Sequence, residues 1–327
     1  MTRPRVGFLG VGWIGRHRLQ AMLATDAVEV VAVADPSPEM VAEALAIAPG
    51  ARAVADLDAI LALAPEGVVI ATPSALHADQ SIQALDAGAA VFCQKPLGRD
   101  EAEAARVVAA ARAADRLLSV DFSYRVTAGM QAIAALVRSG ELGHVFAVDL
   151  VFHNAYGPGK PWFYDRAQSG GGCVMDLGVH LVDLAMWTLG FPALDGAVVA
   201  QLFANGAPLT GDAVEDFATA AFTLAGGTAV RLACSWRANT GRDAEIGATF
   251  YGTAGGASLR NVGGSFYDFT AERYRGTATE TLTTGPDDWG GRAAADWALA
   301  LAQSPRFDAA AERLVEVAAV LDAIYAG

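Results

Sequence analysis

Cysteine, basic charge and long apolar runs are all scarce in this sequence. Three of the 327 residues are cysteine and none forms a Cys-x-x-Cys pair, which excludes a disulfide scaffold and a cysteine metal cage. No uninterrupted apolar stretch reaches the roughly 18 residues of a membrane span. With 23 Lys and Arg against 36 Asp and Glu, the net charge of −13 argues against nucleic-acid or membrane partners. We therefore expect a cytoplasmic protein.

The sequence does contain enough apolar residues, 53%, to form two domain cores. In residues 1–121, short apolar runs alternate with Ala-rich stretches. Continuous apolar strands of this kind indicate a doubly wound parallel sheet, as in a Rossmann domain. We predict strands at Val6–Leu9, Val28–Ala34, Gly67–Ala71, Ala90–Cys93 and Leu117–Val120, and helices at Ile14–Ala24, Glu39–Ala48, Leu76–Ala87 and Glu101–Ala114.

Residues 122–327 have a different pattern and predict an α+β domain with a large, mostly antiparallel open sheet. Gly-Gly pairs at 226–227, 255–256 and 263–264 separate the strand-like runs, as hairpin turns would. The C-terminal helix could pack back on the first domain. We predict strands at 144–152, 197–203, 217–224, 228–236, 244–251, 257–260 and 265–270, and helices at 175–189, 291–302 and 309–325.

A glycine-rich loop follows the first strand and opens the first helix, in the order Gly10-Val-Gly12-Trp13-Ile14-Gly15. Glycines here permit a tight turn and close approach of a pyrophosphate to the helix N-terminus. Asp35 ends the second strand 20 residues after Gly15, where a carboxylate meets ribose hydroxyls. No Arg or Lys directly follows Asp35, so NAD is favoured over NADP. The alternative is a glycine loop that binds nothing.

Two further strands end in polar residues, Thr72-Pro73 and Gln94-Lys95-Pro96. Ligands of open α/β sheets bind at such carboxyl ends. Lys95 lies between an apolar strand and a proline, so we expect it to be held in place, partly desolvated and able to touch a substrate hydroxyl. An ordinary surface lysine is the alternative. His77 either lies near the cofactor or is simply a helix residue.

The strongest cluster of candidate catalytic residues follows three glycines, 170–172. Asp176 and His180 are four residues apart on a predicted helix and share a face, which Asp183 continues. Such a pair can act as an acid/base unit near neutral pH, and the glycines would let another molecule come close. The alternative is a purely structural Asp–His pair. A metal site is less favoured, because no third ligand has suitable spacing.

Aromatic and hydrogen-bonding residues surround the turn Gly157-Pro158-Gly159. His153, Tyr156 and Trp162 are the candidates for substrate contact, since such side chains suit sugar recognition. The alternative is a solvated loop.

Taken together, these motifs resemble those of the Gfo/Idh/MocA oxidoreductase family (glucose–fructose oxidoreductase and inositol dehydrogenase relatives), and the likeness runs nearly end to end. It includes Tyr124-Arg125, which join the candidate substrate-binding residues. The resemblance implies a nicotinamide cofactor, sugar or polyol substrates, and catalytic roles for Lys95, Asp176 and His180. One departure is Gln94, where the family usually has Glu.

Our hypothesis is an NAD-dependent dehydrogenase of a sugar, polyol or sugar derivative. His180 takes the proton, Asp176 orients His180, and Lys95 stabilises the alkoxide; the roles of Lys95 and His180 could be exchanged. Two alternatives remain: an enzyme that retains and recycles NAD for glycoside cleavage or sugar-to-sugar transfer, and a non-catalytic NAD-binding sensor. By analogy with the fold, we expect a homodimer or homotetramer.

Overall fold

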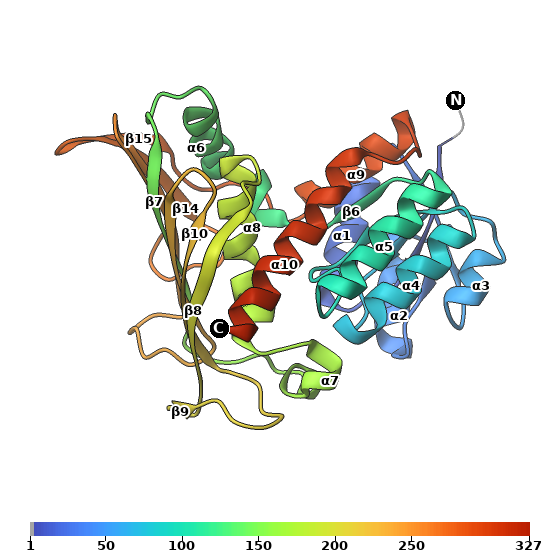
Figure 1. Cartoon of the computed structure of the whole chain (residues 1–327). Helices are drawn as coiled ribbons and strands as arrows, with labels where there is room; N and C mark the ends of the chain where they lie inside the picture. Colours follow the sequence, from blue (N-terminus) through green and yellow to red (C-terminus); the bar gives the residue numbers. More distant parts are fainter. Residues whose placement is uncertain (1–2) are drawn as a thin grey trace. The chain divides into compact units, whose positions relative to one another are not determined.

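The computed structural model describes residues 3–327, which form two compact units (Figure 1). The first unit runs to Ser123 and also contains Gly290–Val315. The second contains Tyr124–Trp289 and Glu316–Gly327. From the sequence we expected domains of 1–121 and 122–327. The segment 290–315 therefore belongs with the first unit, although the sequence analysis assigned it to the second.

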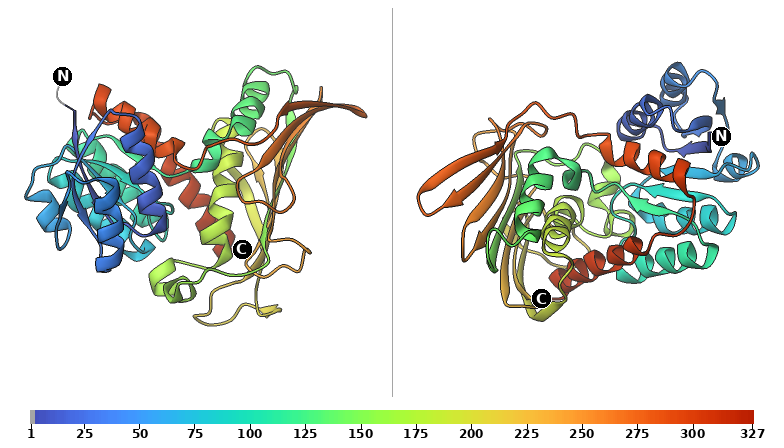
Figure 2. Two further views of the ribbon diagram at one scale, coloured as in Figure 1. Left: turned by 180° about the vertical axis from the view of Figure 1, so that it is seen from behind. Right: turned by 90° about the horizontal axis from the view of Figure 1, so that it is seen from above.

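The first unit contains a six-stranded, all-parallel sheet with helices on both of its faces (Figure 2). Its strand order, β3-β2-β1-β4-β5-β6, is that of a dinucleotide-binding doubly wound sheet, so the predicted fold class is confirmed. The strands are β1 Arg5–Leu9, β2 Glu29–Ala34, β3 Arg52–Ala53, β4 Gly67–Ile70, β5 Ala90–Cys93 and β6 Leu118–Val120.

The longer helices of the first unit match the predicted ones closely. Two short elements were missed, because they contain too few residues to show a hydrophobic periodicity. These are β3 and α3, which the sequence analysis did not predict. Ser37, Asp56 and Asp100 cap α2, α3 and α5 through their side-chain oxygens. The helices are α1 Trp13–Ala24, α2 Pro38–Ile47, α3 Leu57–Leu61, α4 Ser74–Asp86, α5 Glu101–Ala114 and α9 Arg292–Gln303.

Helix α9 explains why the segment 290–315 joins the first unit. Its buried face includes Trp297 and Leu301, which lie in the same core cluster as Val6 and Phe8 of β1. A Cβ atom at Gly67 of β4 would lie 2.7 Å from the Trp297 ring and 2.8 Å from Leu301, so any larger residue there would displace these side chains of α9.

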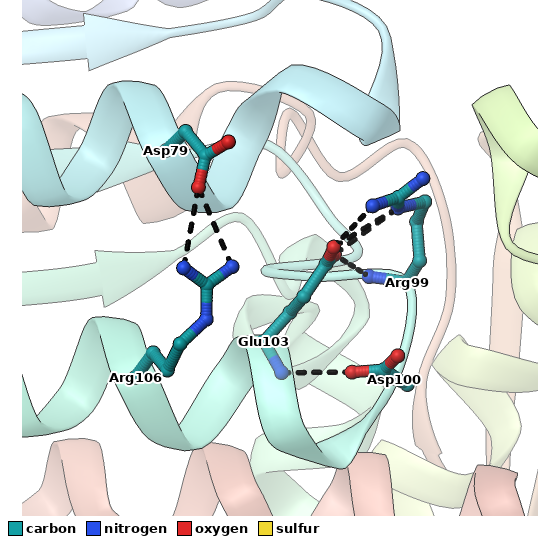
Figure 3. Close-up of polar contacts among 5 residues, drawn as sticks. All are labelled: Asp79, Arg99, Asp100, Glu103 and Arg106. Atoms are coloured by element: carbon teal, nitrogen blue, oxygen red, sulfur yellow. Dashed lines mark hydrogen bonds and ion pairs between the residues drawn. The ribbon is translucent and has the colours of Figure 1, made fainter.

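The turn between β5 and α5 is fixed by charged side chains (Figure 3). The Asp100 carboxylate accepts a hydrogen bond from the Glu103 backbone N–H at 2.7 Å, and Glu103, which is buried, pairs with Arg99. The exposed pair of Arg106 and Asp79, at 3.3 Å, joins α5 to α4 and contributes little to stability. The cap and the buried carboxylate therefore hold the loop that follows β5.

The second unit is built on a nine-stranded sheet with the order β15-β14-β13-β12-β7-β11-β10-β8-β9. Every neighbouring pair is antiparallel except β7 and β11, which run parallel in the middle of the sheet. Its strands are β7 Val145–Asn154, β8 Leu194–Ala204, β9 Ala207–Pro208, β10 Phe217–Leu224, β11 Thr228–Ser235, β12 Ala244–Gly252, β13 Gly256–Asn261, β14 Phe269–Arg275 and β15 Ala278–Thr283.

Helices α6 and α8 cover one face of this sheet, and among the described residues no helix lies on the other, which we name the open face (Figures 1 and 2). Helix α10 begins in the first unit and ends in the second. The helices are α6 Ala128–Arg138, α7 Arg166–Ser169, α8 Val179–Leu189 and α10 Arg313–Ala326, with a π-helical turn at Val174–Gly178 before α8.

Several predicted elements of the second unit were wrong or missing. The strand expected at 265–270 is shifted to Phe269–Arg275, because Ser265 starts a turn in which its hydroxyl bonds Asp268 at 2.9 Å. Helix α6 and strand β15 were not predicted, and the parallel β7–β11 pairing was not foreseen.

The stretch Arg166–Leu189, which contains α7, the π-helical turn and α8, is long and apolar enough to be a candidate membrane span, although 78% of its most apolar window is buried inside the structure. Core helices of globular proteins pass the same test. Within residues 3–327, no group of three or more His, Cys, Asp or Glu side chains is arranged to hold a metal ion.

All three cysteines should resist thiol reagents while the protein is folded. Cys93, Cys173 and Cys234 are buried, and burial raises the pKa of Cys93 to about 12 and that of Cys173 well above its usual value. We expect a chromogenic disulfide reagent at pH 8 to react at least ~100-fold more slowly with native than with guanidinium-unfolded protein. A rapid burst of one thiol in the native protein would contradict this expectation.

Candidate active site

The glycine loop between β1 and α1 fits a diphosphate. Gly10 has φ +85°, and a Cβ there would lie 2.5 Å from the Ala71 carbonyl oxygen. A Cβ at Gly15 would lie 2.2 Å from the Gly10 carbonyl oxygen, so helix and strand are in close contact. Gly12 is the N-cap of α1, and no side chain within residues 3–327 caps that helix. The first N–H groups of α1 therefore suit the oxygens of a cofactor phosphate.

Asp35 lies directly beside this loop, as predicted from its spacing. Its carboxylate accepts hydrogen bonds from the Val11 N–H at 2.8 Å and from the Ser37 N–H at 2.9 Å. Arg16, which the sequence analysis did not consider, bonds the Val11 carbonyl at 2.9 Å and pairs with Glu43 at 2.7 Å. The Arg16 guanidinium is thus already matched by a carboxylate.

The other expected cofactor contacts are placed in three different ways. Trp13 is 57% exposed and stacks on His17 with ring centroids 5.8 Å apart, while Ile14 is half-buried. Thr72, before the Pro73 N-cap of α4, turns its hydroxyl to Gln80 at 2.7 Å. Along the chain, these residues follow the carboxyl ends of β1 and β4.

His77 does not present its ring to a ligand. It is 1% exposed, and its two ring nitrogens each lie 2.7 Å from a carbonyl oxygen, one of Thr72 and one of Pro96. Burial lowers the pKa of His77, and the two carbonyl contacts oppose that shift. We therefore correct the expected cofactor contact: His77 ties together the loops that follow β4 and β5.

Gln94 and Lys95 directly follow β5, and the structure gives a reason for the glutamine. The Gln94 amide donates to the buried Asp121 carboxylate, which also accepts from the Arg18 guanidinium and from the Ser123 hydroxyl. A glutamate at position 94 would place a second carboxylate directly against that of Asp121. Gln94 is thus engaged with Asp121, and Lys95 is half-buried at the strand end.

The second group of candidate residues lies on the π-helical turn Val174–Gly178, which the sequence analysis took for the start of an α-helix. Turns of this kind often occur at functional sites. The Asp176 carboxylate accepts a hydrogen bond from the indole N–H of Trp236 at 2.9 Å. Trp236 directly follows β11 and is fully buried, and no pattern in the sequence links it to a residue 60 positions earlier.

His180 lies on the first turn of α8 among aromatic rings. Its ring is 4.9 Å from the Tyr124 ring, edge to face, and 6.4 Å from the Phe152 ring of β7. Tyr124 is buried and also contacts Trp289 at 4.9 Å. Burial raises the pKa of Tyr124, so its hydroxyl stays protonated. The aromatic surroundings hold the imidazole in place.

The glycines before the turn have a different role from the expected one. A Cβ at Gly171 would lie 1.9 Å from the Tyr325 hydroxyl oxygen, and a Cβ at Gly172 would lie 1.9 Å from the Glu215 carbonyl oxygen. We had expected another molecule to approach these glycines. The groups that approach them are instead Tyr325 and Glu215 of the same chain. Neither partner carried a signal in the sequence.

The structure does not bring all of the predicted substrate-contact residues together. Arg125 forms a bidentate pair with the buried Asp183, whose pKa burial raises and Arg125 lowers in part. His153 stacks on Phe217 at 5.8 Å on the open face, away from His180. This follows from strand alternation, because the neighbouring Phe152 faces α8.

Tyr156 and Trp162 lie on the long loop after β7. Tyr156 is 54% exposed, and Trp162 stacks on Phe163 at 3.8 Å. Tyr164 of the same loop lies 5.3 Å from the Trp236 ring, edge to face. The loop is therefore seated on the tryptophan that holds Asp176.

Comparison with known proteins identifies the family. A model described as "Oxidoreductase family, NAD-binding Rossmann fold" matches residues 4–122, and one described as "GFO/IDH/MocA C-terminal domain" matches residues 130–258. The chain belongs to the GFO/IDH/MocA oxidoreductase family. The resemblance inferred from the motifs is confirmed, and the first unit is the family's NAD-binding domain.

Relatives of known name cover part of the chain. D-glucoside 3-dehydrogenase of Escherichia coli (strain K12) is 31% identical over 58% of this chain and 55% of that protein. Inositol 2-dehydrogenase of Leifsonia xyli subsp. xyli (strain CTCB07) is 36% identical over 58% of this chain and 54% of that protein. The matched region thus spans about half the length of each relative.

A solved structure covers the whole length. Levoglucosan dehydrogenase in complex with NADH and levoglucosan has a TM-score of 0.84 at 22% identity, over 99% of this chain and 97% of that one. This likeness shows that the two proteins have the same fold.

The placement of Asp35 predicts cofactor selectivity. Replacing Asp35→Asn keeps the side-chain shape but removes the charge that repels a 2′-phosphate. We expect the ratio of the Kd for NADPH to that for NADH, measured by nicotinamide fluorescence, to fall by about 10-fold. The matched control is Asp79→Asn on the exposed surface of α4, which should leave the ratio unchanged. An unchanged ratio in Asp35→Asn would rule out its ribose contact.

Proposed function

We propose that the protein is an NAD-dependent dehydrogenase that oxidises a hydroxyl of a sugar, polyol or sugar derivative. The observation that carries this proposal is that one chain combines two features. It has a glycine cradle with Asp35 beside it, and it has the Asp176 carboxylate on a π-helical turn that leads into α8, where the His180 imidazole lies four residues later. The first suits a dinucleotide, and the second suits proton transfer.

Each side chain of the site then has a defined task. Bound NAD supplies the hydride acceptor, so that a carbinol yields a carbonyl, NADH and one proton. We assign the removal of that hydroxyl proton to His180, with Asp176 orienting the ring. Lys95 stabilises the negative charge that develops on the substrate oxygen. Trp236 holds the Asp176 carboxylate through its indole N–H.

The proposed substrate class is supported by the names of the relatives and by the aromatic loop. The relatives are named for a glucoside and for inositol, both polyhydroxylated rings. Tyr156 and Trp162 offer aromatic faces of the kind that pack against the C–H face of a sugar. We place the reaction in the cytoplasm, because the three cysteines are free thiols.

We also propose that the open face joins two copies of the chain, in a homodimer or homotetramer. The face carries a groove of about 770 Å³ in which Val199 is 68% exposed. Although the chain carries a net charge of −13, the groove is lined by three arginines and two acidic residues. Two copies can therefore approach here without strong repulsion, and opposite charges can pair across a twofold axis. The charged residues that line the groove are Arg231, Arg242, Arg260, Asp149 and Glu245.

The proposed chemistry predicts specific losses of turnover. We expect His180→Ala and Lys95→Ala each to lower kcat by at least ~100-fold, with the Kd for NADH changed by less than ~3-fold. NADH absorbance with aldoses, inositols and sugar acids gives the rates, and His144→Ala at an exposed loop position is the control. Rescue of His180→Ala by added imidazole would assign the proton to His180, whereas rescue of Lys95→Ala by a primary amine alone would exchange the roles.

Near-normal turnover in both variants would contradict the mechanism. NAD that stays bound, with product formed but no net NADH, would favour the recycling enzyme. NAD binding without turnover of any substrate would favour the sensor.

The proposed assembly predicts an effect of Val199→Asp. A buried charge in the groove should lower the mass seen by light scattering toward that of the 33.7 kDa chain. The control is Val262→Asp, a substitution of another exposed valine outside the groove. A monomeric wild-type protein, or a Val199→Asp variant with unchanged mass, would rule out this interface.

A further inference from the structure

Glu215, just before β10, receives three successive N–H groups from the segment that starts the π-helical turn. Its carboxylate accepts from the Gly172 N–H at 3.0 Å and the Val174 N–H at 2.9 Å. Its own carbonyl oxygen accepts from the Cys173 N–H at 2.9 Å. A third donor, the Tyr325 hydroxyl of α10, reaches the same carboxylate at 2.8 Å. All of these groups belong to the second unit.

This contact is closed to solvent and leaves little room for adjustment. Glu215 is 1% exposed. A Cβ at Gly172 would clash with the Glu215 backbone, and a Cβ at Gly171 would clash with the Tyr325 hydroxyl, so neither position has room for a side chain. A carboxylate at the N-terminal end of a helix also faces the positive end of its dipole. Burial raises the pKa of Glu215, and the N–H and O–H donors oppose this rise.

The next residue, Asp216, fixes the other contact of Asp176. The Asp216 carbonyl oxygen accepts from the Trp236 N–H at 2.8 Å and from the Ser235 hydroxyl at 2.9 Å. The Trp236 indole in turn donates to the Asp176 carboxylate. The dipeptide 215–216 therefore holds both the turn that carries Asp176 and the tryptophan that binds its carboxylate.

We propose that Glu215 is a positioning residue for Asp176 and His180. It binds the N–H groups of residues 172–174, which lead into the π-helical turn, and the Tyr325 hydroxyl supports its carboxylate. This inference rests on the proposed function of that pair. Glu215 touches neither substrate nor cofactor, and it acts only through the geometry of the turn.

Steady-state kinetics give the first test. Glu215→Gln keeps the shape and one acceptor oxygen but turns an NH₂ group toward an N–H or O–H donor. We expect kcat to fall by about 10- to 100-fold, as for a misplacement of reacting groups by a fraction of an ångström to 1 Å. Tyr325→Phe, which removes one donor, should lower kcat about 3-fold. Binding of NADH to the first unit should change by less than about 2-fold in both variants.

The matched control is Glu280→Gln, an exposed glutamate on β15, which should retain wild-type kcat. An unchanged kcat in Glu215→Gln would overturn the proposal. A loss of NADH affinity equal to the loss of kcat would do the same, because it would indicate a general structural defect.

A double-mutant cycle separates positioning from mere stabilisation. If Glu215 acts through Asp176, then Glu215→Gln should have less than about a 3-fold effect on the residual kcat of an Asp176→Asn variant. The same 10- to 100-fold loss in both backgrounds would show that Glu215 does not act through Asp176.

Amide hydrogen exchange tests the contact independently of activity. The peptide that covers 172–176 should exchange about 10-fold faster in Glu215→Gln than in the wild type, while peptides of β4 and β5 are unchanged. If the wild type oxidises no substrate, the proposed function fails, but this faster exchange still supports the capping of the turn. Unchanged exchange in this peptide overturns the capping role whatever the activity.

Discussion

Buried backbone N–H groups need an acceptor, and the second unit depends on how this requirement is met at the start of its central helix. Two helix starts that follow glycine-rich segments, those of α1 and of the π-helical turn, differ in how their N–H groups are treated. At α1, no side chain within residues 3–327 caps the helix. The nearby Asp35 carboxylate accepts hydrogen bonds from the N–H groups of Val11 and Ser37, which lie outside that helix. At the π-helical turn, Glu215 takes the N–H groups of 172 and 174. The second helix start is therefore capped by a side chain of the protein itself, whereas that of α1 is not.

Two buried carboxylates, one in each unit, have partners of opposite charge within their own unit. Asp121 lies between the Arg18 guanidinium and the Gln94 amide, and Asp183 pairs with Arg125. Removing one partner of such a pair costs about 3–5 kcal/mol, because it leaves a charge unpaired in a poorly polarisable interior. The glutamine at position 94 is consistent with this pairing, since a carboxylate there would give Asp121 a like-charged neighbour. Arg125, predicted to bind substrate, is occupied in the same way.

The first unit was largely predictable because its information is local. Each parallel strand is a continuous apolar run, and the spacing from Gly15 to Asp35 reports a strand–helix–strand unit directly. The second unit was less predictable because its contacts are long-range. Neither the β7–β11 pairing nor the contact of Trp236 with Asp176 leaves a period in the sequence. Asp176 and His180 could be proposed from their spacing, whereas Glu215, Trp236 and Arg18, which contact the candidate residues or their neighbours, could not.

Glycine was the residue type whose role was hardest to infer. A glycine indicates that another group comes close to the backbone, but its position in the sequence does not identify that group. For Gly10 the close group is the neighbouring strand, which leaves the helix end open for a cofactor. For Gly171 and Gly172 the close groups are Tyr325 and Glu215, from segments 154 and 43 residues away.

Strand β7 shows how one element can serve two purposes through alternation alone. Phe152 faces α8, where its ring lies 6.4 Å from that of His180, and the next residue, His153, faces the open side and stacks on Phe217. Because side chains alternate along a strand, a one-residue shift in register would exchange the two faces. The pairing of β7 with β11 and β12 on either side fixes that register over most of its length. The same central strands therefore keep the proposed chemistry on one face and the proposed assembly on the other, so that residues can change on the open face without disturbing the imidazole.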